Sequence, residues 1–315
     1  MNKLISIGEL LIDFIPKEKG RKLKDVVNYE RVAGGAPANV AACVTRLGGS
    51  AIMLTKVGKD GFGDHLIESL NAVGVDTSHI KRTDKANTAL AFVSLTNDGE
   101  RDFSFYRNPS ADMLLEPKDI DESIFKKGDV LHFCSVDLVD YPVRKAHKAA
   151  IEYAQKHDMI ISFDPNLRFP LWPDKDAYKK TINQFIPEAH ILKISDDELL
   201  FITGIENKSD AIQSLFKGNV RVIILTEGSN GASIYTKQNV IFVPSEKVKP
   251  VDTTGAGDSF IGAIIYQLLA RGINLNNLED VQDEAILSFA HKVSQHVVLE
   301  KGAIPVMPTK QDLRK

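Results

Sequence analysis

The stretch that decides the fold and the chemistry is VDTTGAGDSF, which spans Val251–Phe260 and leads directly into an apolar helical pattern. Over Ser259–Ala270, apolar residues recur every four positions, and Gly272 ends the pattern. Small residues at a helix start let backbone N–H groups approach an anion closely, and the helix dipole favours negative charge there. The spacing therefore predicts an anion site at the N-terminal end of a helix.

Asp258 falls in the first turn of this predicted helix, beside the expected anion. Phosphoryl transfer to an alcohol needs both parts, because the moving phosphoryl group carries charge and the hydroxyl must lose its proton to a base. A simpler interpretation is also open, in which Thr254 caps the helix, the glycines form a turn and Asp258 complements the dipole. The stretch is not a Walker A loop, because no Gly-Lys-Ser/Thr follows it.

Short apolar runs recur along the rest of the chain, and helical patterns alternate with them. The runs are 4–7, 51–54, 130–133, 159–163, 191–194 and 222–225. The helical patterns are 36–47, 66–73 and 259–270. Runs of this kind are typical of strands that are buried on both faces of a parallel sheet. The alternation predicts a doubly wound α/β fold that binds ligands beyond the carboxyl ends of its strands.

One segment differs from this alternation. Residues 89–96 and 101–106 have the pattern of two strands, and Asn97-Asp98-Gly99 between them favours a type I′ turn. In the second of these strands, Phe103 and Phe105 alternate with polar neighbours. We therefore expect a small, half-exposed antiparallel layer beside the main sheet, and we expect it to act as a lid.

Two segments carry a resemblance to a known family. Asp252–Asp258 resembles the C-terminal signature of the PfkB (ribokinase-like) carbohydrate kinases, and Ala33–Ala41 is similar to their N-terminal Gly-Gly-x-x-x-Asn signature. The similarity runs from Gly8 to about Pro305. It implies one kinase domain over residues 1–315, with a three-layer α/β/α fold, a mainly parallel central sheet and a small β-sheet lid near 14–32 and 88–107. The implied catalytic residues are Asp258 as the base, with an anion hole formed by the amides of Gly255, Ala256 and Gly257.

Four N-terminal residues are expected at the sugar. Asp13 follows the first strand, where a carboxylate can accept hydrogen bonds from two sugar hydroxyls, although it can also be a solvated turn residue. Gly34 and Gly35 permit close approach of the backbone to a ligand. Asn39 offers both a donor and an acceptor at a helix start, or it is an ordinary helix residue.

Residues 105–113 and 164–172 are similar to segments of bacterial and plant fructokinases. The resemblance implies sugar-binding roles for Arg107, Asn166 and Arg168, with Arg107 reaching from the hairpin over the sugar. Either arginine can instead form a structural ion pair. The implied reaction converts ATP and D-fructose into ADP and fructose 6-phosphate. The same chemistry on 2-keto-3-deoxygluconate or ribose is the alternative, and a non-catalytic sugar-binding relative is a more distant one.

The nucleotide side follows from two further matches. Residues 193–198 resemble the family's Lys-x-Asn-x-x-Glu stretch, which implies that Lys193 contacts the nucleotide and that Glu198 holds Mg²⁺ directly or through water. Ser195 stands where the family usually has Asn, and Ser195-x-x-Glu198 is also a capping box. Residues 226–231 resemble the Thr-x-Gly-x-x-Gly nucleotide turn. The remaining implied nucleotide contacts are Thr226, Gly228, Gly231 and His291, of which the histidine can also be a satisfied surface side chain.

A monovalent cation, which is K⁺ in many relatives, is expected beside the anion hole. Asp252 and Thr254 match the positions that support it, and Gly302 offers a carbonyl. Val298 and Val306 offer backbone groups alone, which argues for an incomplete ring of oxygens. The expected ligands are therefore a sugar, ATP, Mg²⁺ and K⁺.

The composition is that of an ordinary globular protein. The chain has 315 residues, of which 43% are hydrophobic, and a formal net charge of −3. Its pI near 6.3 argues against nucleic acid as a partner. Cys43 and Cys134 lack C-x-x-C spacing and are expected to be buried thiols. No apolar run approaches membrane-spanning length, so we expect a cytoplasmic protein without a membrane partner, and a homodimer is allowed.

Overall fold

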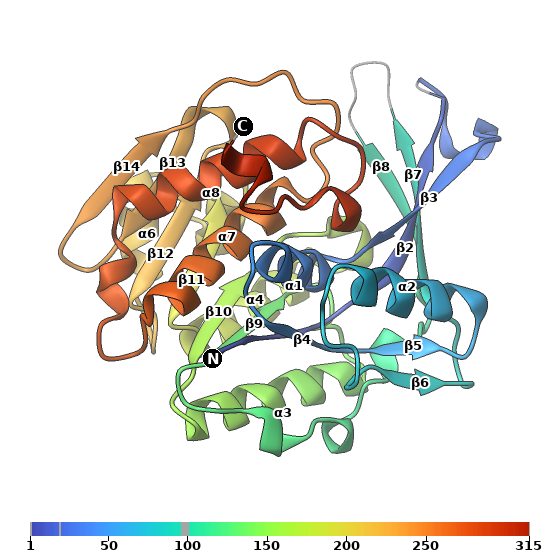
Figure 1. Ribbon diagram of the computed structural model, residues 1–315, viewed down its shortest axis with the longest axis horizontal. Coiled ribbons are helices and arrows are strands. Elements are labelled where there is room, and N and C mark those ends of the chain that lie inside the picture. Colours follow the sequence, from blue (N-terminus) through green and yellow to red (C-terminus); the bar gives the residue numbers. More distant parts are fainter. Residues whose placement is uncertain (1, 19, 96–100, 315) are drawn as a thin grey trace.

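The computed structural model describes residues 2–18, 20–95 and 101–314, which fold around an eight-stranded sheet (Figure 1). The strand order is β14-β13-β12-β11-β10-β9-β1-β4. The parallel strands are β1 (Leu4–Ile7), β4 (Ala51–Leu54), β9 (Val130–Cys134), β10 (Ile160–Asp164), β11 (Ile191–Ser195) and β12 (Val222–Thr226). They agree with all the predicted runs to within one residue at either end.

Two antiparallel strands extend this sheet beyond β12 and were not expected. They are β13 (Gly231–Tyr235) and β14 (Val240–Pro244). Residues of β14 alternate between exposed and half-buried positions, as on a solvent-facing edge. Its sequence, VIFVP, does not alternate in polarity. Nothing in it therefore distinguishes an exposed edge strand from a buried segment.

Helices cover both faces of the sheet, and this confirms the three-layer α/β/α fold (Figure 1). One face carries α1 (Ala36–Arg46), α2 (Gly61–Ala72), α7 (Ala256–Arg271) and α8 (Glu284–Val297). The other face carries α3 (Pro142–Lys156), α4 (Lys175–Phe185), α5 (Asp196–Thr203) and α6 (Lys208–Ser214). Along β1, Leu4 packs in the first core and Ile5 in the second. Burial on both faces explains why the parallel strands are apolar throughout.

Two helices begin earlier than the sequence predicted. The helix α7 begins at Ala256 rather than at Ser259, which places Asp258 in its first turn, as the anion-site hypothesis requires. The helix α2 begins at Gly61 because the side chain of Asp60 caps it. The early turn of α7 consists of small or polar residues, and the early turn of α2 is small or polar apart from Phe62, so both extend beyond the apolar periodicity from which the helices were predicted.

A second sheet projects from the body of the molecule beside the main sheet (Figure 1). Its order is β3-β2-β7-β8, with β2 (Leu11–Pro16), β3 (Tyr29–Gly34), β7 (Ala89–Leu95) and β8 (Arg101–Tyr106). The predicted hairpin is present as the antiparallel pair β7 and β8. Its Asp98-Gly99 turn lies outside the described residues. A short parallel pair lies apart from both sheets and consists of β5 (Lys56–Gly58) and β6 (Lys81–Thr83).

The two faces of the second sheet differ in character. An aromatic cluster occupies one face and consists of Phe14, Tyr29, Phe92 and Tyr106. Within it, the rings of Phe14 and Phe92 stack at 4.7 Å between centroids. The opposite face contributes Leu11, Ile15 and Phe105 to the lining of a cavity. The two-residue period of the strands thus gives one face of the sheet to this cavity.

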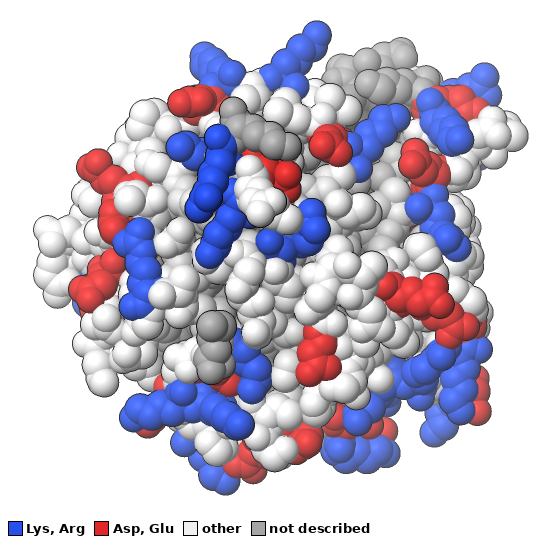
Figure 2. Space-filling view, in the orientation of Figure 1, with Lys and Arg blue, Asp and Glu red and all other residues white. Residues whose placement is uncertain are grey.

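Charged side chains of both signs are interspersed over the surface shown in Figure 2. Within the described ranges, no helix is both long and apolar enough to cross a bilayer. Cys43 and Cys134 are buried and free, as the sequence predicted. Burial raises the pKa of both thiols, which keeps them in the unreactive protonated form.

Candidate active site

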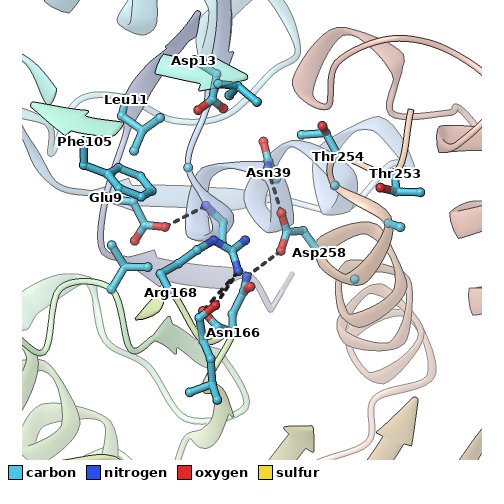
Figure 3. Close-up of a pocket in the computed structure, with 18 of the residues that line it drawn as sticks. Glu9, Leu11, Asp13, Asn39, Phe105, Asn166, Arg168, Thr253, Thr254 and Asp258 are labelled. Atoms are coloured by element: carbon cyan, nitrogen blue, oxygen red, sulfur yellow. Dashed lines mark hydrogen bonds between the residues drawn. The ribbon is translucent and has the colours of Figure 1, made fainter. Parts of the chain in front are cut away.

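A cavity of about 460 Å³ opens where the carboxyl ends of the central strands meet the second sheet (Figure 3). Open α/β sheets bind their ligands at this edge, and the volume suits a small organic ligand. The lining comes from β2, the start of α1, the loop after β10, β11 and the start of α7. The predicted site residues in it are Asp13, Gly35, Asn39, Asn166, Arg168, Lys193, Thr254, Gly255, Ala256, Gly257 and Asp258.

The start of α7 forms one wall of the cavity. Gly255 precedes the helix in the left-handed conformation, with φ 75°, and a Cβ there would lie 2.8 Å from the Cβ of Ala303. Glycine is therefore required for the turn that brings residues 255–257 to the cavity. The first N–H groups of a helix have no carbonyl partner within it, so this end attracts an anion. The N–H of Ala256 also makes a long contact, of 3.3 Å, with the carbonyl of Thr253.

Thr254 does not cap α7, so the simpler interpretation of this stretch is wrong at that residue. Its N–H and its hydroxyl both donate to Asp252 Oδ1, at 2.9 and 2.7 Å. Asp252 Oδ2 accepts a hydrogen bond from the N–H of Gly302 at 3.0 Å. The three residues expected around a monovalent cation therefore lie together, although Gly302 contributes its N–H to this contact rather than its carbonyl.

Asp258 is buried in the first turn of α7, with 7% of its surface exposed. Asn39 Nδ2 donates to its Oδ2 at 2.8 Å, and Asn166 Nδ2 donates to its Oδ1 at 3.1 Å (Figure 3). The two amides orient the carboxylate without neutralising it. Burial raises the pKa of Asp258, against the opposing effects of these hydrogen bonds and of nearby cations. A carboxylate with a raised pKa is a stronger base.

The loop after β10 brings Asn166 and Arg168 to the cavity. Asn166 has φ 45°, a left-handed conformation that asparagine adopts more readily than most residues. Arg168 lines the cavity, and its Nη1 donates to the carbonyl of Leu167 at 2.9 Å (Figure 3). In the described part of the chain, Arg168 forms no ion pair with a carboxylate. Its guanidinium group is therefore available to a ligand.

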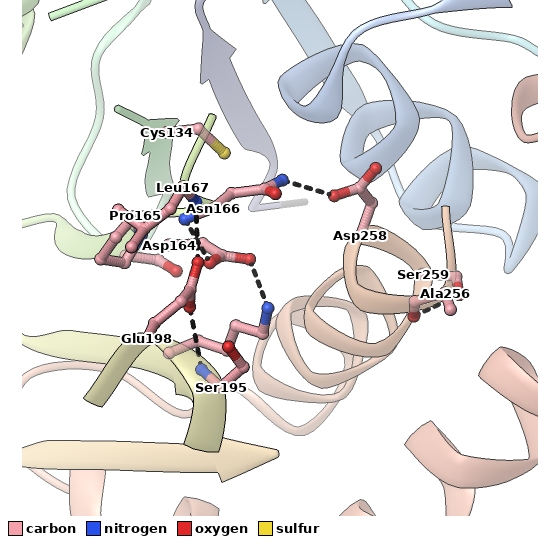
Figure 4. A network of polar contacts seen from close by, with 12 residues as sticks. Cys134, Asp164, Pro165, Asn166, Leu167, Ser195, Glu198, Ala256, Asp258 and Ser259 are labelled. Atoms are coloured by element: carbon pink, nitrogen blue, oxygen red, sulfur yellow. Dashed lines mark hydrogen bonds and ion pairs between the residues drawn. The ribbon is translucent and has the colours of Figure 1, made fainter. Parts of the chain in front are cut away.

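A buried ion pair lies next to the start of α7. Lys193 Nζ is 2.9 Å from Asp164 Oδ2 (Figure 4), and 3.2 Å from the position that a Cβ on Gly257 would take. Burial raises the pKa of Asp164 to about 7, against the pull of Lys193. Burial also disfavours the charged lysine, but Asp164 and other nearby carboxylates outweigh it and raise the pKa of Lys193. This places a lasting positive charge beside the anion site, where the predicted nucleotide contact needs one.

Glu198 lies beside this pair and does not belong to the cavity lining. Its Oε1 accepts from the N–H of Leu167 at 2.7 Å, and its Oε2 accepts from the N–H of Ser195 at 2.9 Å (Figure 4). The capping box is therefore present. Among the described residues, no three acidic, histidine or cysteine side chains lie close enough to hold a metal alone. Mg²⁺ usually keeps several waters and binds phosphate oxygens, so a single carboxylate acting through water fits it.

Gly34 and Gly35 allow two acidic residues to come close. A Cβ on Gly34 would lie 2.3 Å from Asp13 Oδ2, and a Cβ on Gly35 would lie 2.4 Å from the carbonyl oxygen of Glu9. The sequence predicted that these glycines let the backbone approach a ligand. In the structure, the close approach is made by Asp13 and Glu9. Asp13 itself lines the cavity on the side of the second sheet (Figure 3).

Arg107 is not where the sequence predicted it. Its guanidinium donates to Asp112 and Asp137, the three side chains are 1–2% exposed, and Arg107 does not line the cavity. Burial opposes its charge, but the two aspartates outweigh that effect and raise its pKa. The expected position over the sugar is therefore corrected to the structural ion pair that the sequence left open. Carboxylates compete better than neutral hydroxyls for a guanidinium.

Glu9 lines the cavity, and sequence reasoning missed it as a site residue. It is 3% exposed, and its Oε1 accepts from the N–H of Ala36, the first residue of α1, at 2.9 Å (Figure 3). Burial, together with the nearby charge of Asp137, raises the pKa of Glu9 to about 8. The available signal was an acid inside an apolar run, because such an acid is costly to bury unless it is partnered or protonated.

The other residues predicted for the nucleotide lie outside the cavity lining. Thr226 ends β12, and Gly228 follows at a turn where an added Cβ would meet nothing within 4 Å. Gly231 packs closely on β14, since a Cβ there would lie 2.4 Å from the carbonyl oxygen of Val243. His291 Nε2 donates to the same carbonyl at 3.1 Å. The histidine is thus satisfied, as the alternative held, but it is buried and not on the surface. Gly228 has open space beside it.

A helix start that attracts anions, a buried carboxylate beside it and a cavity at the strand ends, in a three-layer α/β/α fold, define a ribokinase-like phosphotransferase. Comparison with known proteins agrees with this class. The family model described as pfkB family carbohydrate kinase matches residues 1–310, and the chain belongs to this family. The resemblance indicated by the two signatures is therefore confirmed.

Similar proteins span nearly the whole chain. "Probable fructokinase-5" of Arabidopsis thaliana is 43% identical over 99% of this chain and 96% of that protein. "Fructokinase-2" of Solanum lycopersicum is 42% identical over 97% of this chain and 93% of that protein. The fructokinase from Vibrio cholerae O395, solved with fructose, ADP and calcium ion bound, is 32% identical and has a TM-score of 0.90. The match covers 100% of this chain and 98% of that chain. The fructokinase with bound ATP from Xylella fastidiosa is 33% identical and has a TM-score of 0.89. The match covers 99% of this chain and 97% of that chain.

Proposed function

We propose that this protein transfers the γ-phosphoryl group of ATP to D-fructose, which forms fructose 6-phosphate and ADP, with Asp258 as the base. The observation that carries this function is the position of Asp258, a buried carboxylate in the first turn of α7 that two amides orient. Fructose as the acceptor is supported by relatives named fructokinases and by a similar structure that holds fructose and ADP.

In this reaction the sugar hydroxyl attacks the γ-phosphorus, and its proton passes to Asp258. The bond from the γ-phosphorus to the bridging oxygen breaks, and ADP leaves with that electron pair. The amides of Gly255, Ala256 and Gly257 stabilise the charge on the transferred group, because they point from the N-terminal end of α7. Lys193 adds positive charge on the same side of the cavity.

The sugar fits between Asp258 and the second sheet. Asp13 offers acceptors on that side, and Arg168 offers donors from the loop after β10. Gly34 leaves room for the carboxylate of Asp13. The apolar side chains of the second sheet would cover the C–H faces of the sugar. We propose that this sheet is the lid, which excludes water when sugar is bound.

For the nucleotide, we propose a site at the carboxyl end of β12, where Thr226 and Gly228 lie, with Gly231 supporting the turn. We do not assign His291 to this site, because it already donates to a backbone carbonyl. Mg²⁺ bound to the phosphates would neutralise part of their charge, and Glu198 would hold it through water.

We also propose that K⁺ binds near the loop before α7, where Asp252, Thr254 and Gly302 lie together. A cation there would stabilise the turn at Gly255 by charge and would take no part in the chemistry. The cytoplasmic location and the homodimer stay predictions.

Release of ADP from MgATP, measured with fructose, ribose, glucose and 2-keto-3-deoxygluconate, tests the reaction. We expect the highest kcat/KM with fructose. A tenfold preference (about 1.4 kcal/mol) for ribose or 2-keto-3-deoxygluconate would replace the acceptor and leave the kinase assignment standing. No sugar-dependent ADP release with any of the four would contradict the kinase assignment and favour the non-catalytic relative.

A further inference from the structure

A buried cluster of ionisable side chains lies beside the sugar end of the cavity and consists of Glu9, Arg107, Asp112 and Asp137. The guanidinium of Arg107 donates to both aspartates. Glu9 faces Asp137 and Arg107, while its Oε1 accepts from the N–H of Ala36. One guanidinium therefore balances three carboxyl groups that are all shielded from solvent.

The cluster lies where the second sheet joins the body of the molecule. Glu9 lies in the connection from β1 to β2, and Arg107 directly follows β8. Ala36, which donates to Glu9, begins α1 just after the end of β3. Asp137 belongs to the body, in the loop after β9. The cluster thus ties three connections of the second sheet, those at β2, β3 and β8 in Figure 1, to the body.

The charges of the cluster do not balance when every carboxyl group is ionised. Glu9 Oε2 and Asp137 Oδ2 are both buried and have no hydrogen-bond partner within the described residues. Burial raises the pKa of Glu9, with Asp137 adding to the effect and Arg107 opposing it. Burial likewise raises the pKa of Asp137, with Asp112 adding and Arg107 opposing. A proton on Glu9 removes one of two facing negative charges and leaves Arg107 to pair with the aspartates.

We propose that Glu9 is a positioning residue for the sugar that works in its protonated form, by holding the connections of the second sheet in place beside the cavity. This inference rests on the proposed function, because the sugar is the ligand expected on that side. Neutral Glu9 keeps its bond to Ala36 and its close packing on Gly35, so the edge of the cavity that contains Asp13 stays in position. Ionised Glu9 adds a negative charge beside Asp137, and their repulsion loosens the connection between β1 and β2.

The pH dependence of sugar binding separates this role from a purely structural one. A requirement for one proton on a group whose pKa is about 8 predicts a rise of about tenfold in KM for fructose between pH 7 and pH 9. The KM for ATP should stay constant, because the proposed nucleotide end is built on α7 and β12, outside the connections that the cluster holds.

The experiment measures KM for fructose from pH 7 to pH 9, at saturating MgATP, for the wild type, Glu9→Gln and Glu152→Gln. Glutamine has the size of the protonated acid and cannot ionise, so the KM of Glu9→Gln should be the same at both ends of this range. Glu152 is exposed on α3, and its variant is the matched control that should follow the wild type.

Three kinetic results would overturn the inference: a flat wild-type profile, a Glu9→Gln profile that rises like the wild type, or a Glu9→Gln KM at pH 7 as high as that of the wild type at pH 9. The first would remove the proton requirement, and the second would place the proton elsewhere. The third would mean that removing the charge of Glu9 does not preserve sugar binding, so the neutral state of the side chain is not what positions the edge of the cavity.

A second measurement tests the proton without using the kinase activity. In protein labelled with ¹³C at the glutamate carboxyl carbons, one resonance should titrate near pH 8, and Asp137→Asn should move its midpoint to lower pH because the facing charge is gone. If no glutamate carboxyl titrates above pH 7, or if Asp137→Asn leaves the midpoint unchanged, the inference is wrong even in an active fructose kinase. A resonance that behaves as expected in a protein inactive on every sugar supports the protonated cluster and contradicts the proposed function.

Discussion

Replacing Asp258 with asparagine tests the proposed base, and the structure predicts that the fold tolerates the change. Asp258 accepts one hydrogen bond on each oxygen, from Asn39 and from Asn166. The amide of the variant keeps one oxygen, which can still accept from Asn166, but its NH₂ group would then face the NH₂ group of Asn39. Because Asn39 Oδ1 has no partner among the described residues, turning over the amide of Asn39 restores both bonds. The cost of an unmatched buried group, about 1–3 kcal/mol, is thereby avoided.

The catalytic loss should be large by contrast. An amide cannot take up the hydroxyl proton, and a positioned base contributes about 10² to 10⁴ in rate. That factor corresponds to about 3–5.5 kcal/mol of activation free energy. We therefore expect kcat to fall by this amount in Asp258→Asn, while the dissociation constants for fructose and ATP change little. Asp84→Asn, at a side chain that is 76% exposed, is the matched control and should keep the wild-type kcat.

Single-turnover phosphoryl transfer with excess enzyme measures the chemical step apart from product release. Titration calorimetry with fructose, in the presence of ADP, measures binding to the same variant. A kcat within about threefold of the wild type, far short of what a positioned base contributes, would remove Asp258 from the mechanism. Loss of folding would refute the reasoning about the amides instead, since it would mean that Asn39 and Asn166 require a charged partner.

Four further predictions concern other parts of the site. Gly34→Ala places a methyl group where the carboxylate of Asp13 now lies, so KM for fructose should rise by about tenfold or more. Gly61→Ala, where an added Cβ meets nothing within 4 Å, is its control, and equal KM values for the two variants would contradict the close approach of Asp13 to Gly34. Arg107→Ala leaves two buried carboxylates unpaired and should lower the free energy of unfolding in urea by about 3–5 kcal/mol; unchanged stability with a raised KM would restore its sugar-binding role. Rates in K⁺, Na⁺ and tetramethylammonium, at equal ionic strength, test the cation near Asp252, and equal rates would exclude a functional site. The free energy of unfolding should fall as pH rises from about 5 to 8, because the pKa of Glu9 is 4.5 in the unfolded chain and about 8 in the folded protein. The stabilisation that the protonated side chain contributes is therefore complete below pH 4.5 and is lost as the pH rises through 8. Thermal unfolding of Glu9→Gln should lack this part of the decline.

The central sheet could be predicted from the sequence because its signal is local. Each parallel strand is buried on both faces, so its residues are apolar throughout. The start of α7 also depends on adjacent residues, with Gly255 for the turn and Asp258 for the first helical turn. Parallel strands then bring their carboxyl ends to one edge, which is how Asn166, just after β10, could be placed at this edge. Asp13 reaches the same cavity from within β2 of the second sheet.

The choice of partner between distant residues could not be predicted in this way. Asn39 and Asp258 are 219 residues apart, and neither local sequence shows that the amide orients the base. The partner of Arg107 could not be predicted for the same reason, because Asp137 reaches it through the packing of the loop after β9 and not through any spacing along the chain. Glu9 was missed because an acid in an apolar run does not by itself reveal its partner, and here that partner is the N–H of Ala36, 27 residues further along the chain.

The partners of the buried acids decide which of them can act as the base. Asp164 is paired with Lys193, so taking up a proton would cost it that ion pair. Glu9 is unsuitable for a different reason: burial favours its protonated form near neutral pH, and a group that already holds a proton cannot accept one. Asp258 receives its two hydrogen bonds from neutral amides, which orient it without taking its charge, and it lies beside the anion-attracting end of α7. The role that we propose for Asp258 is therefore supported by its surroundings in the fold, in addition to the motif in which it was first noticed.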